Sequence, residues 1–399
     1  MKSPTPSKTN IFICVVTLIL GWAIARHLRL QSKIYDWIVT TKLFHSDLIA
    51  YHHLIDQLQW ISNFSTNQSV LSSGKTPVIF YDRKYLYHPT DPSGCRYKCI
   101  FHNNTRKLGK GDVVVFSDKF SLEEAKSLKQ RGVLIAFETG ESPFHMPSLE
   151  ASLLSQVDMF NTYMADSPVP YMYPMFVRNT KRKLKFTNEE KSAMLAKNNT
   201  YLLPHYHKQR KNLIAWVVSN HWPRNNRKEY AEAIAKFIPV DIYGLEGKKV
   251  PIGLDVFQWL SENYKFYLAF ENSNCKNYIS EKPTENALSF GMVPIVLGAY
   301  KEDYDDVLPP HSYINVDDFE SIRELTDYLL YLDRNDTAYA NYFAWKEHGE
   351  IYKENRMDCR LCGFMHQLNE QKTSLEWPRF PDFVDPQRLC FNRPLLPLQ

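Results

Sequence analysis

The sequence predicts an α/β protein in which two successive halves of the chain each form a parallel sheet. Short apolar runs typical of buried strands occur at residues 77–81, 112–116 and 133–137, and again at 213–218, 240–243, 266–270 and 293–297. Helical patterns separate several of these runs, and such alternation is typical of parallel sheets joined by crossover helices. A chain of 399 residues is long enough for two domains with separate cores.

The composition indicates a folded protein with a small anionic ligand rather than a nucleic-acid partner. Hydrophobic residues make up 44% of the chain and charged residues 23%, values typical of globular domains. The formal net charge is +4, and no Lys/Arg block alternates with aromatic residues as a nucleic-acid-binding face would require. We therefore expect no nucleic-acid partner.

One apolar run without charges, residues 11–25, lies between Lys8 and Arg26. It is short for a bilayer span of about 20 residues, although thin membranes accept shorter segments. Ala23-Ile24-Ala25 also fits a cleavage site, so a signal anchor and a cleaved signal peptide are both open. Either one would deliver the rest of the chain to the secretory lumen.

Sequons and cysteines agree with a lumenal compartment. Candidate glycosylation sites are Asn63, Asn67, Asn103, Asn198 and Asn335. Cys14 lies in the apolar run, and the remaining six cysteines would permit three bridges. We expect Cys95 and Cys99 to bridge to Cys359 and Cys362, with Cys275 and Cys390 left over; pairing within each doublet is the alternative. The single CxxC motif favours this structural role over zinc binding.

In the first half, the three strand runs lead to a loop that carries a carboxylate. Ser121, with Glu124 three residues later, predicts a capping box for a helix that continues to about residue 130. Glu141 follows the strand run 133–137, in the Gly- and Pro-marked loop Thr-Gly-Glu-Ser-Pro. A carboxylate at the carboxyl end of a parallel strand is well placed to face a cleft.

In the second half, a helix predicted at about residues 225–237 joins the runs 213–218 and 240–243, and residues 266–298 form a βαβ unit. Ser280 is placed to cap the short helix of this unit, Pro283 falls in its first turn and Gly291 is placed to end it. Ligands of such units bind in the crevice beyond the carboxyl ends of the strands. The polar residues predicted there are Glu271, Asn272, Tyr278, Glu281 and Lys282. Together with a helix N-terminus, they suit an anionic, ring-bearing ligand such as a nucleotide sugar.

The amino-acid sequence of residues 266–298 closely resembles the signature of a known family. FENS-x4-YISEK, followed by NA-x3-G-x-VPIV-x-G, resembles the signature of the α1,3/α1,4-fucosyltransferases, which transfer fucose from GDP-fucose. Further segments resemble the same family in order: the Glu-Ser-Pro at residues 141–143, TYMADS at 162–167, WVVSN at 216–220, and YANYFAWK with CRLC near the carboxyl end. The resemblance covers roughly residues 76–365.

The resemblance implies the GT-B fold, two facing Rossmann-like domains, in a Golgi type II membrane protein. The expected parts are a cytoplasmic tail (1–10), a signal-anchor transmembrane segment (11–25), a stem (26–75) through which the protein could form oligomers, an acceptor domain (76–205), a donor domain (206–350) and a carboxyl-terminal segment that packs back (351–399). The catalytic domain would be lumenal, with GDP-fucose as donor and an N-acetylglucosamine-containing glycan, such as an N-glycan, as acceptor.

The resemblance also assigns roles to residues. Glu141 corresponds to the proposed general base, and Arg227 to an arginine that contacts the donor pyrophosphate, with neighbouring Arg224 as the alternative. Asn220, Glu271, Asn272, Tyr278, Glu281 and Lys282 would complete the donor site. The two side-chain cations Arg227 and Lys282 can balance a pyrophosphate, so no metal or other cofactor is obligatory, although a divalent ion such as Mn²⁺ could stimulate.

Two departures concern the acceptor. Ser117-Asp118-Lys119 stands where vertebrate members usually carry His-His-Arg, a segment associated with acceptor choice, and Met164-Ala165 replaces two arginines. These departures leave open whether the acceptor is the core or an antenna of an N-glycan. Two other functions also stay open: transfer of a sugar from another nucleotide sugar, and glycan or nucleotide binding without catalysis. Asp303-Tyr304-Asp305 fits a D-x-D metal motif, but we expect it to be an acidic surface run.

Overall fold

The computed structural model describes residue 54 and residues 56–62, 74–82, 90–178, 186–245, 247–375 and 381–399. All of them belong to the compact unit Tyr51–Gln399, and residues 1–50 lie outside the described residues. The predicted tail and anchor, most of the stem, and the sequons at Asn63 and Asn67 therefore lie outside what is described. Among the described helices, none is both long and apolar enough to cross a bilayer.

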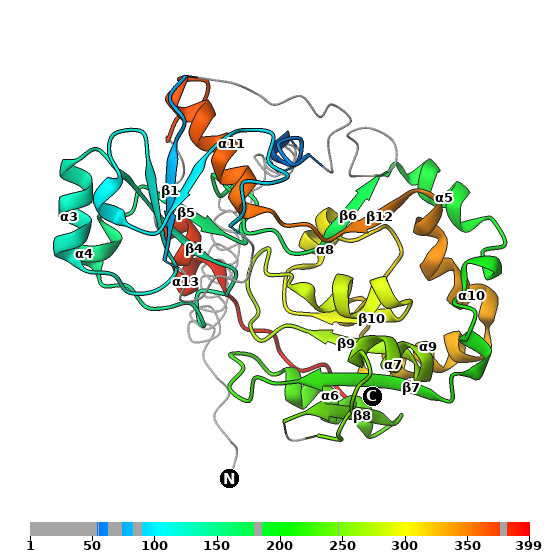
Figure 1. The fold of residues 1–399 in the computed structure, drawn as a ribbon. Coiled ribbons are helices and arrows are strands. Elements are labelled where there is room, and N and C mark those ends of the chain that lie inside the picture. Colours follow the sequence, from blue (N-terminus) through cyan, green and yellow to red (C-terminus); the bar gives the residue numbers. More distant parts are fainter. Residues whose placement is uncertain are drawn as a thin grey trace, which may run out of the picture. The chain divides into compact units, whose positions relative to one another are not determined.

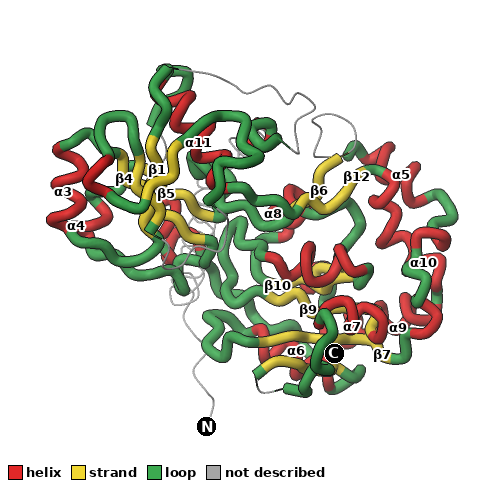
Figure 2. The backbone as a smooth tube through the Cα atoms, viewed as in Figure 1, coloured by secondary structure: helices red, strands yellow, loops and turns green. Residues whose placement is uncertain are grey.

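The first half forms the predicted parallel sheet (Figures 1 and 2). Its strands, in the order β2-β1-β3-β4-β5, are β2 (Ile100–His102), β1 (Val78–Tyr81), β3 (Val113–Phe116), β4 (Leu134–Thr139) and β5 (Met159–Thr162). Every neighbouring pair is parallel. Since successive side chains of a strand point to opposite faces, this sheet needs cover on both sides.

Both faces of the first sheet are covered by helices. On one face, Val114, Phe116 and Phe137 pack with side chains of α3 (Leu122–Gln130), α4 (Ala151–Leu154), α12 (Pro381–Val384) and α13 (Pro386–Leu389). On the other face, Val113 and Val115 pack against α11 (Met357–Asn369). The Ser121 hydroxyl accepts a hydrogen bond from the Glu124 amide and caps α3, as the sequence predicted.

The second half forms another parallel sheet, in the order β11-β10-β9-β7-β8. Its strands are β11 (Ile314–Asn315), β10 (Val293–Leu297), β9 (Tyr264–Phe270), β7 (Asn212–Val218) and β8 (Val240–Gly244). One face packs on α6 (Arg227–Ala235) and α9 (Ile322–Arg334), and the other on α7 (Val256–Asn263), α8 (Lys301–Val307) and the turns at 282–290. The predicted α/β fold with parallel sheets is therefore confirmed.

Smaller elements lie beside the second sheet. They are the antiparallel pair β6 (Met175–Arg178) and β12 (Gly349–Tyr352), α5 (Asn188–Leu195) and α10 (Asp336–Ala340). The chain then returns to the first half through α11 and α13 before its last residues run along the second half. There Tyr230 donates to the Pro394 carbonyl, and the Ile322 amide donates to the Pro397 carbonyl.

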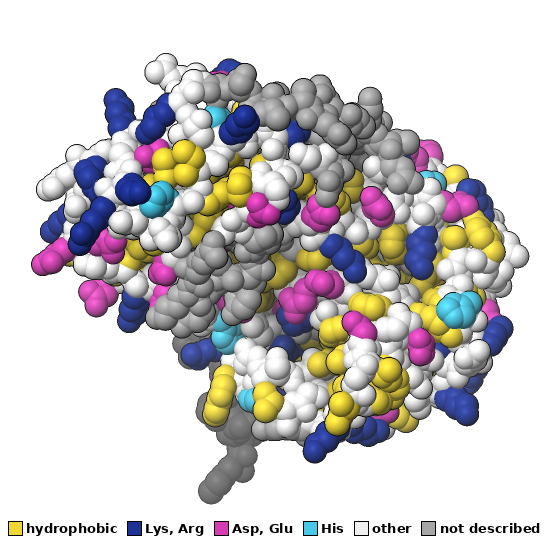
Figure 3. All heavy atoms as spheres, in the orientation of Figure 1, with side chains coloured by type: hydrophobic (Ala, Val, Ile, Leu, Met, Phe, Trp, Pro, Cys, Tyr) yellow, Lys and Arg dark blue, Asp and Glu magenta, His cyan; other side chains and the backbone are white. Residues whose placement is uncertain are grey.

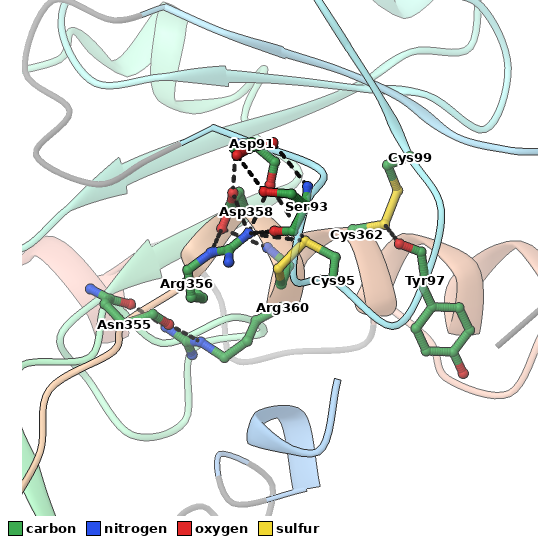
Figure 4. The surroundings of a disulfide bond; sticks show 11 residues. Asp91, Ser93, Cys95, Tyr97, Cys99, Asn355, Arg356, Asp358, Arg360 and Cys362 are labelled. Atoms are coloured by element: carbon green, nitrogen blue, oxygen red, sulfur yellow. Dashed lines mark hydrogen bonds and ion pairs between the residues drawn. A yellow bond between two sulfur atoms is a disulfide. The ribbon is translucent and has the colours of Figure 1, made fainter. Parts of the chain in front are cut away.

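Disulfides fasten this returning segment. Cys95 bonds to Cys359 and Cys99 to Cys362, so two bridges attach α11 to the loop before β2, as predicted (Figure 4). Arg356 adds an ion pair with Asp358 and donates to the Asp91 carbonyl (Figure 4). The two cysteines that the sequence left over, Cys275 and Cys390, bond to each other and tie the 271–282 segment to the carboxyl-terminal tail.

Two local predictions differ from the structure. Instead of a regular helix capped by Ser280, residues 282–287 form a π-turn and residues 288–290 a 3₁₀ turn, and the Ser280 hydroxyl bonds to Glu271 instead of capping. Gly291 does end this segment, in the left-handed conformation with φ 83°. Asp303, expected on the surface, is buried, because it caps the start of α8 and binds a neighbouring loop.

Candidate functional site

The site begins where the strand order of the second sheet reverses. The chain goes from β7 to β8 on one side and then crosses to β9 on the other, so the loops after β7 and β9 diverge from a shared crevice. Arg227, at the start of α6, is buried and joins the two strand ends. Its guanidinium donates to the carbonyl of Phe270, the last residue of β9, at 3.2 Å and to the Asn220 carbonyl after β7 at 2.8 Å.

The segment 271–282 after β9 balances its own charges. Glu271 is fully buried and accepts hydrogen bonds from the Ser280 amide and hydroxyl and from Lys282, whose Nζ lies 2.9 Å from Oε2. Burial acts to lower the pKa of Lys282, but Glu271 and Glu281 outweigh it and hold the pKa above its usual value. Lys282 is therefore a permanent cation. Gly298 leaves room for this arrangement, since a Cβ there would lie 2.6 Å from the Glu271 Cβ.

The middle of the same segment is held by Asp303 of α8. The Asp303 carboxylate accepts hydrogen bonds from the Asn277 amide at 2.7 Å and from the Asn277 side chain at 2.8 Å. Asn277 has a positive φ of 56°, a conformation that asparagine tolerates better than most residues. Burial raises the pKa of Asp303 to about 7, although these hydrogen bonds oppose the shift.

The loop 139–147 after β4 of the first sheet lies against this segment. Tyr278 is buried and donates a hydrogen bond to the Glu141 carboxylate at 3.1 Å. The hydroxyls of Ser142 and Ser273 are 2.7 Å apart and both buried. Burial raises the pKa of Tyr278 well above its ordinary value, so its phenol stays protonated and keeps donating. Glu141 itself is exposed.

A cavity of about 730 Å³ opens between the loop and the segment. Its lining residues are Ser117, Asp118, Glu138, Thr139, Gly140, Glu141, His145, Pro147, Tyr171, Tyr173, Asn220, Asn272 and Glu281. Among these described residues, four are carboxylates and none is Lys or Arg. Such a lining suits sugar hydroxyls and a centre on which positive charge develops.

The structure divides the predicted site residues into two groups. Four line the cavity: Glu141, Asn220, Asn272 and Glu281. The other four are not among the lining residues. Arg227 donates to the carbonyl of lining residue Asn220, Tyr278 donates to Glu141, and Lys282 pairs with Glu271 and with lining residue Glu281. The alternative arginine, Arg224, is exposed, and its amide donates to the Asn272 carbonyl at 2.7 Å.

The cavity lining includes residues that the sequence reasoning did not single out, among them Glu138, His145 and Tyr173. Glu138 sits within a strand that reads as apolar, and the lone His145 has no motif spacing. Tyr173 donates to the Gly140 carbonyl at 2.8 Å and supports the turn that presents Glu141. The position of His145, four residues after Glu141 in the same loop, is the one signal that could have found it.

The remaining candidates lie apart from the cavity. Asn103 and Asn198 are exposed, whereas the Asn335 side chain caps α10 and donates to Tyr331. Among the described residues, the groups with metal-ligand spacing are Cys99-Cys362-His366 and Cys95-Asp358-Cys359, and their cysteines are engaged in disulfides. Basic and acidic side chains are interspersed on the face of the molecule in Figure 3.

Comparisons with known proteins point to one family. Residues 207–377 match the model of the carboxyl-terminal part of glycosyltransferase family 10 (fucosyltransferase). Glycoprotein 3-alpha-L-fucosyltransferase A of Drosophila melanogaster is 34% identical over 343 residues, which cover 81% of this chain and 63% of that protein. Alpha-(1,3)-fucosyltransferase 4 of Homo sapiens is 31% identical over 309 residues, which cover 75% of this chain and 54% of that protein.

A solved structure shares the fold. The crystal structure of an alpha1,3-fucosyltransferase superposes with a TM-score of 0.50 at 18% identity and covers 80% of this chain and 96% of that one. The chain thus spans less than two thirds of the length of these two curated relatives, but nearly all of the solved structure.

Proposed function

We propose that this chain, which belongs to glycosyltransferase family 10, the fucosyltransferases, moves L-fucose from GDP-fucose to a hydroxyl of N-acetylglucosamine in glycoprotein glycans. The linkage would be α1,3, on the core or the antennae of an N-glycan. One observation carries the proposal: Glu141 of the first half faces a cavity whose opposite side is the family's signature segment, 271–282.

In the proposed reaction, Glu141 is the general base. Its carboxylate takes the proton of the acceptor hydroxyl while that oxygen bonds to the anomeric carbon of fucose, and the bond from this carbon to GDP breaks with inversion. Tyr278 holds one carboxylate oxygen of Glu141, which leaves the other directed at substrate. The acidic lining, which includes Glu138 and Glu281, would stabilise the positive charge that a sugar ring gains when its leaving group departs.

The leaving GDP would lie at the Lys282 and Arg227 end of the site. Departure builds negative charge on the β-phosphate, and fixed cations stabilise it best where water is excluded. Lys282 is already paired with Glu271, and both terminal nitrogens of Arg227 donate to carbonyls. These cations would therefore position the backbone around the crevice as well as contact the phosphate directly. Arg224 is exposed, so its guanidinium could turn toward a phosphate.

The wider setting belongs to the same proposal. The fold would be GT-B with an acceptor domain at 76–205 and a donor domain at 206–350, in a single-pass type II Golgi membrane protein anchored by residues 11–25. The returning segment 351–399, through α11 and α13, would fix the acceptor domain. The reaction needs no obligatory cofactor, and a divalent ion such as Mn²⁺ would only stimulate it.

Donor titration and product analysis test the proposal. The purified lumenal part should bind GDP-fucose more tightly than GDP-mannose and UDP-sugars in isothermal titration calorimetry. A panel of N-glycan acceptors should then yield a product whose linkage analysis shows fucose on position 3 of N-acetylglucosamine. Preference for a UDP-sugar, or donor binding with no transfer to any acceptor, would refute it.

A further inference from the structure

His145, close to Glu141 in the sequence, has a ring nitrogen without a hydrogen-bond partner among the described residues. It lies on the loop 139–147, its amide donates to the Ser142 carbonyl at 2.9 Å, and its ring lines the cavity together with Glu141. The imidazole Nε2 is buried and has no hydrogen-bond partner among the described residues. A buried polar atom without a partner is costly, which suggests that a ligand completes it.

The second ring nitrogen defines the tautomer. The backbone of Asn272 lies beside the ring and favours its protonated form, as a carbonyl oxygen does, and the same carbonyl accepts from the Arg224 amide. Since Nε2 has no partner among the described residues, we assign the proton to Nδ1, the ring nitrogen left to face this carbonyl. In a neutral imidazole with its proton on Nδ1, Nε2 is a hydrogen-bond acceptor only.

The surroundings keep the ring neutral. Burial is the largest influence and lowers the pKa of His145 below its usual value, and Arg224 and Arg227 act in the same direction. Glu141 and the Asn272 carbonyl favour the protonated ring but do not outweigh burial. A neutral acceptor nitrogen cannot bind a phosphate oxygen, which is itself an acceptor. It can bind a hydroxyl.

We propose that His145 Nε2 accepts a hydrogen bond from a hydroxyl of the acceptor sugar and so orients the reacting hydroxyl toward Glu141. This inference rests on the proposed function and makes His145 a specificity-determining residue of the acceptor site. The acceptor is favoured over the fucosyl group because His145 and the base share one loop of the first half, four residues apart. From the signature segment of the second half, the backbone of Asn272 lies beside the ring.

The test compares His145→Ala with His145→Gln in the full chain. Glutamine places an acceptor oxygen near the position of Nε2, whereas alanine removes it. We expect His145→Ala to raise the acceptor KM about tenfold, with the dissociation constants of GDP and GDP-fucose unchanged, and His145→Gln to recover most of that loss. Thermal denaturation of both variants separates this effect from misfolding.

Acceptor analogues that each lack one hydroxyl sharpen the test. For one analogue, the KM with the wild-type enzyme should rise by the same factor as the KM of the intact acceptor rises in His145→Ala. With His145→Ala, this analogue and the intact acceptor should have the same KM. The wild-type acceptor KM should also rise as the pH falls through the pKa of His145, because protonated Nε2 no longer accepts, and the alanine variant should lack this rise.

Three results would overturn the inference. Weaker binding of GDP-fucose but not of GDP to His145→Ala would place the hydroxyl on fucose. A lower kcat at constant acceptor KM would mean that His145 acts through Glu141, and unchanged kinetics would mean that it binds no substrate. A wild-type enzyme that transfers no fucose would instead refute the proposed function, which these variants do not test.

Discussion

The segments 139–147 and 271–282, which meet at the cavity, differ in whether their carboxylates are buried and paired. In 271–282, Glu271 is fully buried and its charge is matched by Lys282 and the Ser280 donors. In 139–147, Glu141 is exposed, and its carboxylate accepts a hydrogen bond from Tyr278. Both carboxylates follow a parallel strand, yet of the two only Glu141 is exposed, as the proposed general base must be.

This difference separates stability from turnover. Removing one partner of a buried ion pair strongly destabilises the folded protein, because the other charge stays buried without compensation. An exposed carboxylate has no such role in folding, and its loss changes the chemistry instead. Substitutions in 271–282 should therefore lower the free energy of unfolding, and the replacement of Glu141 should leave it almost unchanged.

The largest expected effect is that of Lys282→Ala. It leaves Glu271 buried without its cation, so the free energy of unfolding should fall by about 3–5 kcal/mol, together with a loss of GDP-fucose binding. Chemical denaturation and isothermal titration measure the two effects. The matched control is Lys301→Ala, which breaks an exposed ion pair with Asp318 and should cost less than about 1 kcal/mol. Equal losses in the two variants would contradict the contrast between the segments.

Asp303→Asn should change how stability depends on pH. The pKa of Asp303, about 7 in the folded protein, lies above the ordinary value of 3.8, so the folded state binds this proton more tightly than the unfolded state. Its stabilising contribution is complete below pH 3.8 and is lost as the pH rises through 7. This should lower the free energy of unfolding by up to about 4 kcal/mol between those limits.

Denaturation at a series of pH values would show this slope in the wild type and its absence in Asp303→Asn. Asp305→Asn is the control, because Asp305 is exposed on the same helix and should leave the slope intact. If the slope survives in Asp303→Asn, another group titrates in this range and the 271–282 segment does not depend on the protonation of Asp303.

Glu141→Gln should spare the stability and the GDP-fucose binding that Lys282→Ala loses, and should lower turnover instead. The amide is nearly isosteric and can still accept the Tyr278 hydrogen bond, so folding and GDP-fucose binding should persist. Turnover should fall by about 10²-fold or more, because the amide cannot take a proton. Steady-state kinetics with calorimetry on the same preparation measures both. Normal turnover in this variant would assign the base to another residue.

The sequence predicted the frame of this molecule better than its contacts. Continuous apolar runs such as 293–297 marked buried strands correctly, because strands covered on both faces have no polar alternation. The short β2 and β11 have too few residues to give such a signal. Asp303 was expected on the surface because it stands in a run of acidic residues, and only the folded chain brings it to Asn277.

The site followed the same rule. Motif resemblance singled out Glu141, Tyr278 and Lys282 as candidates. Local sequence could not show that Tyr278 contacts Glu141 of the first half or that Lys282 is paired with Glu271. These contacts depend on how the 139–147 loop packs against the 271–282 segment. Residues far apart in sequence, 137 positions for Tyr278 and Glu141, give no periodic pattern that would reveal their contact.

The smallest effect concerns the contact that joins the two segments. Tyr278→Phe removes the hydrogen bond to Glu141 and keeps the ring that packs on Tyr163, with ring centroids 4.9 Å apart. Hydrogen bonds to charged groups contribute about 1.5–3 kcal/mol. Since Glu141 is exposed and water can replace part of this bond, we expect a loss of about tenfold in kcat, which corresponds to about 1.4 kcal/mol. The dissociation constant of GDP-fucose should stay within about twofold.

Tyr163→Phe is the matched control for that variant. The Tyr163 hydroxyl is buried and has no hydrogen-bond partner among the described residues, so its removal should leave kcat unchanged. If Tyr278→Phe weakens donor binding and spares kcat, Tyr278 contacts the donor directly. The buried side chain would then have to leave its present position when substrate binds. A loss confined to kcat instead means that the second half orients the base of the first, so that the signature segment acts on both substrates.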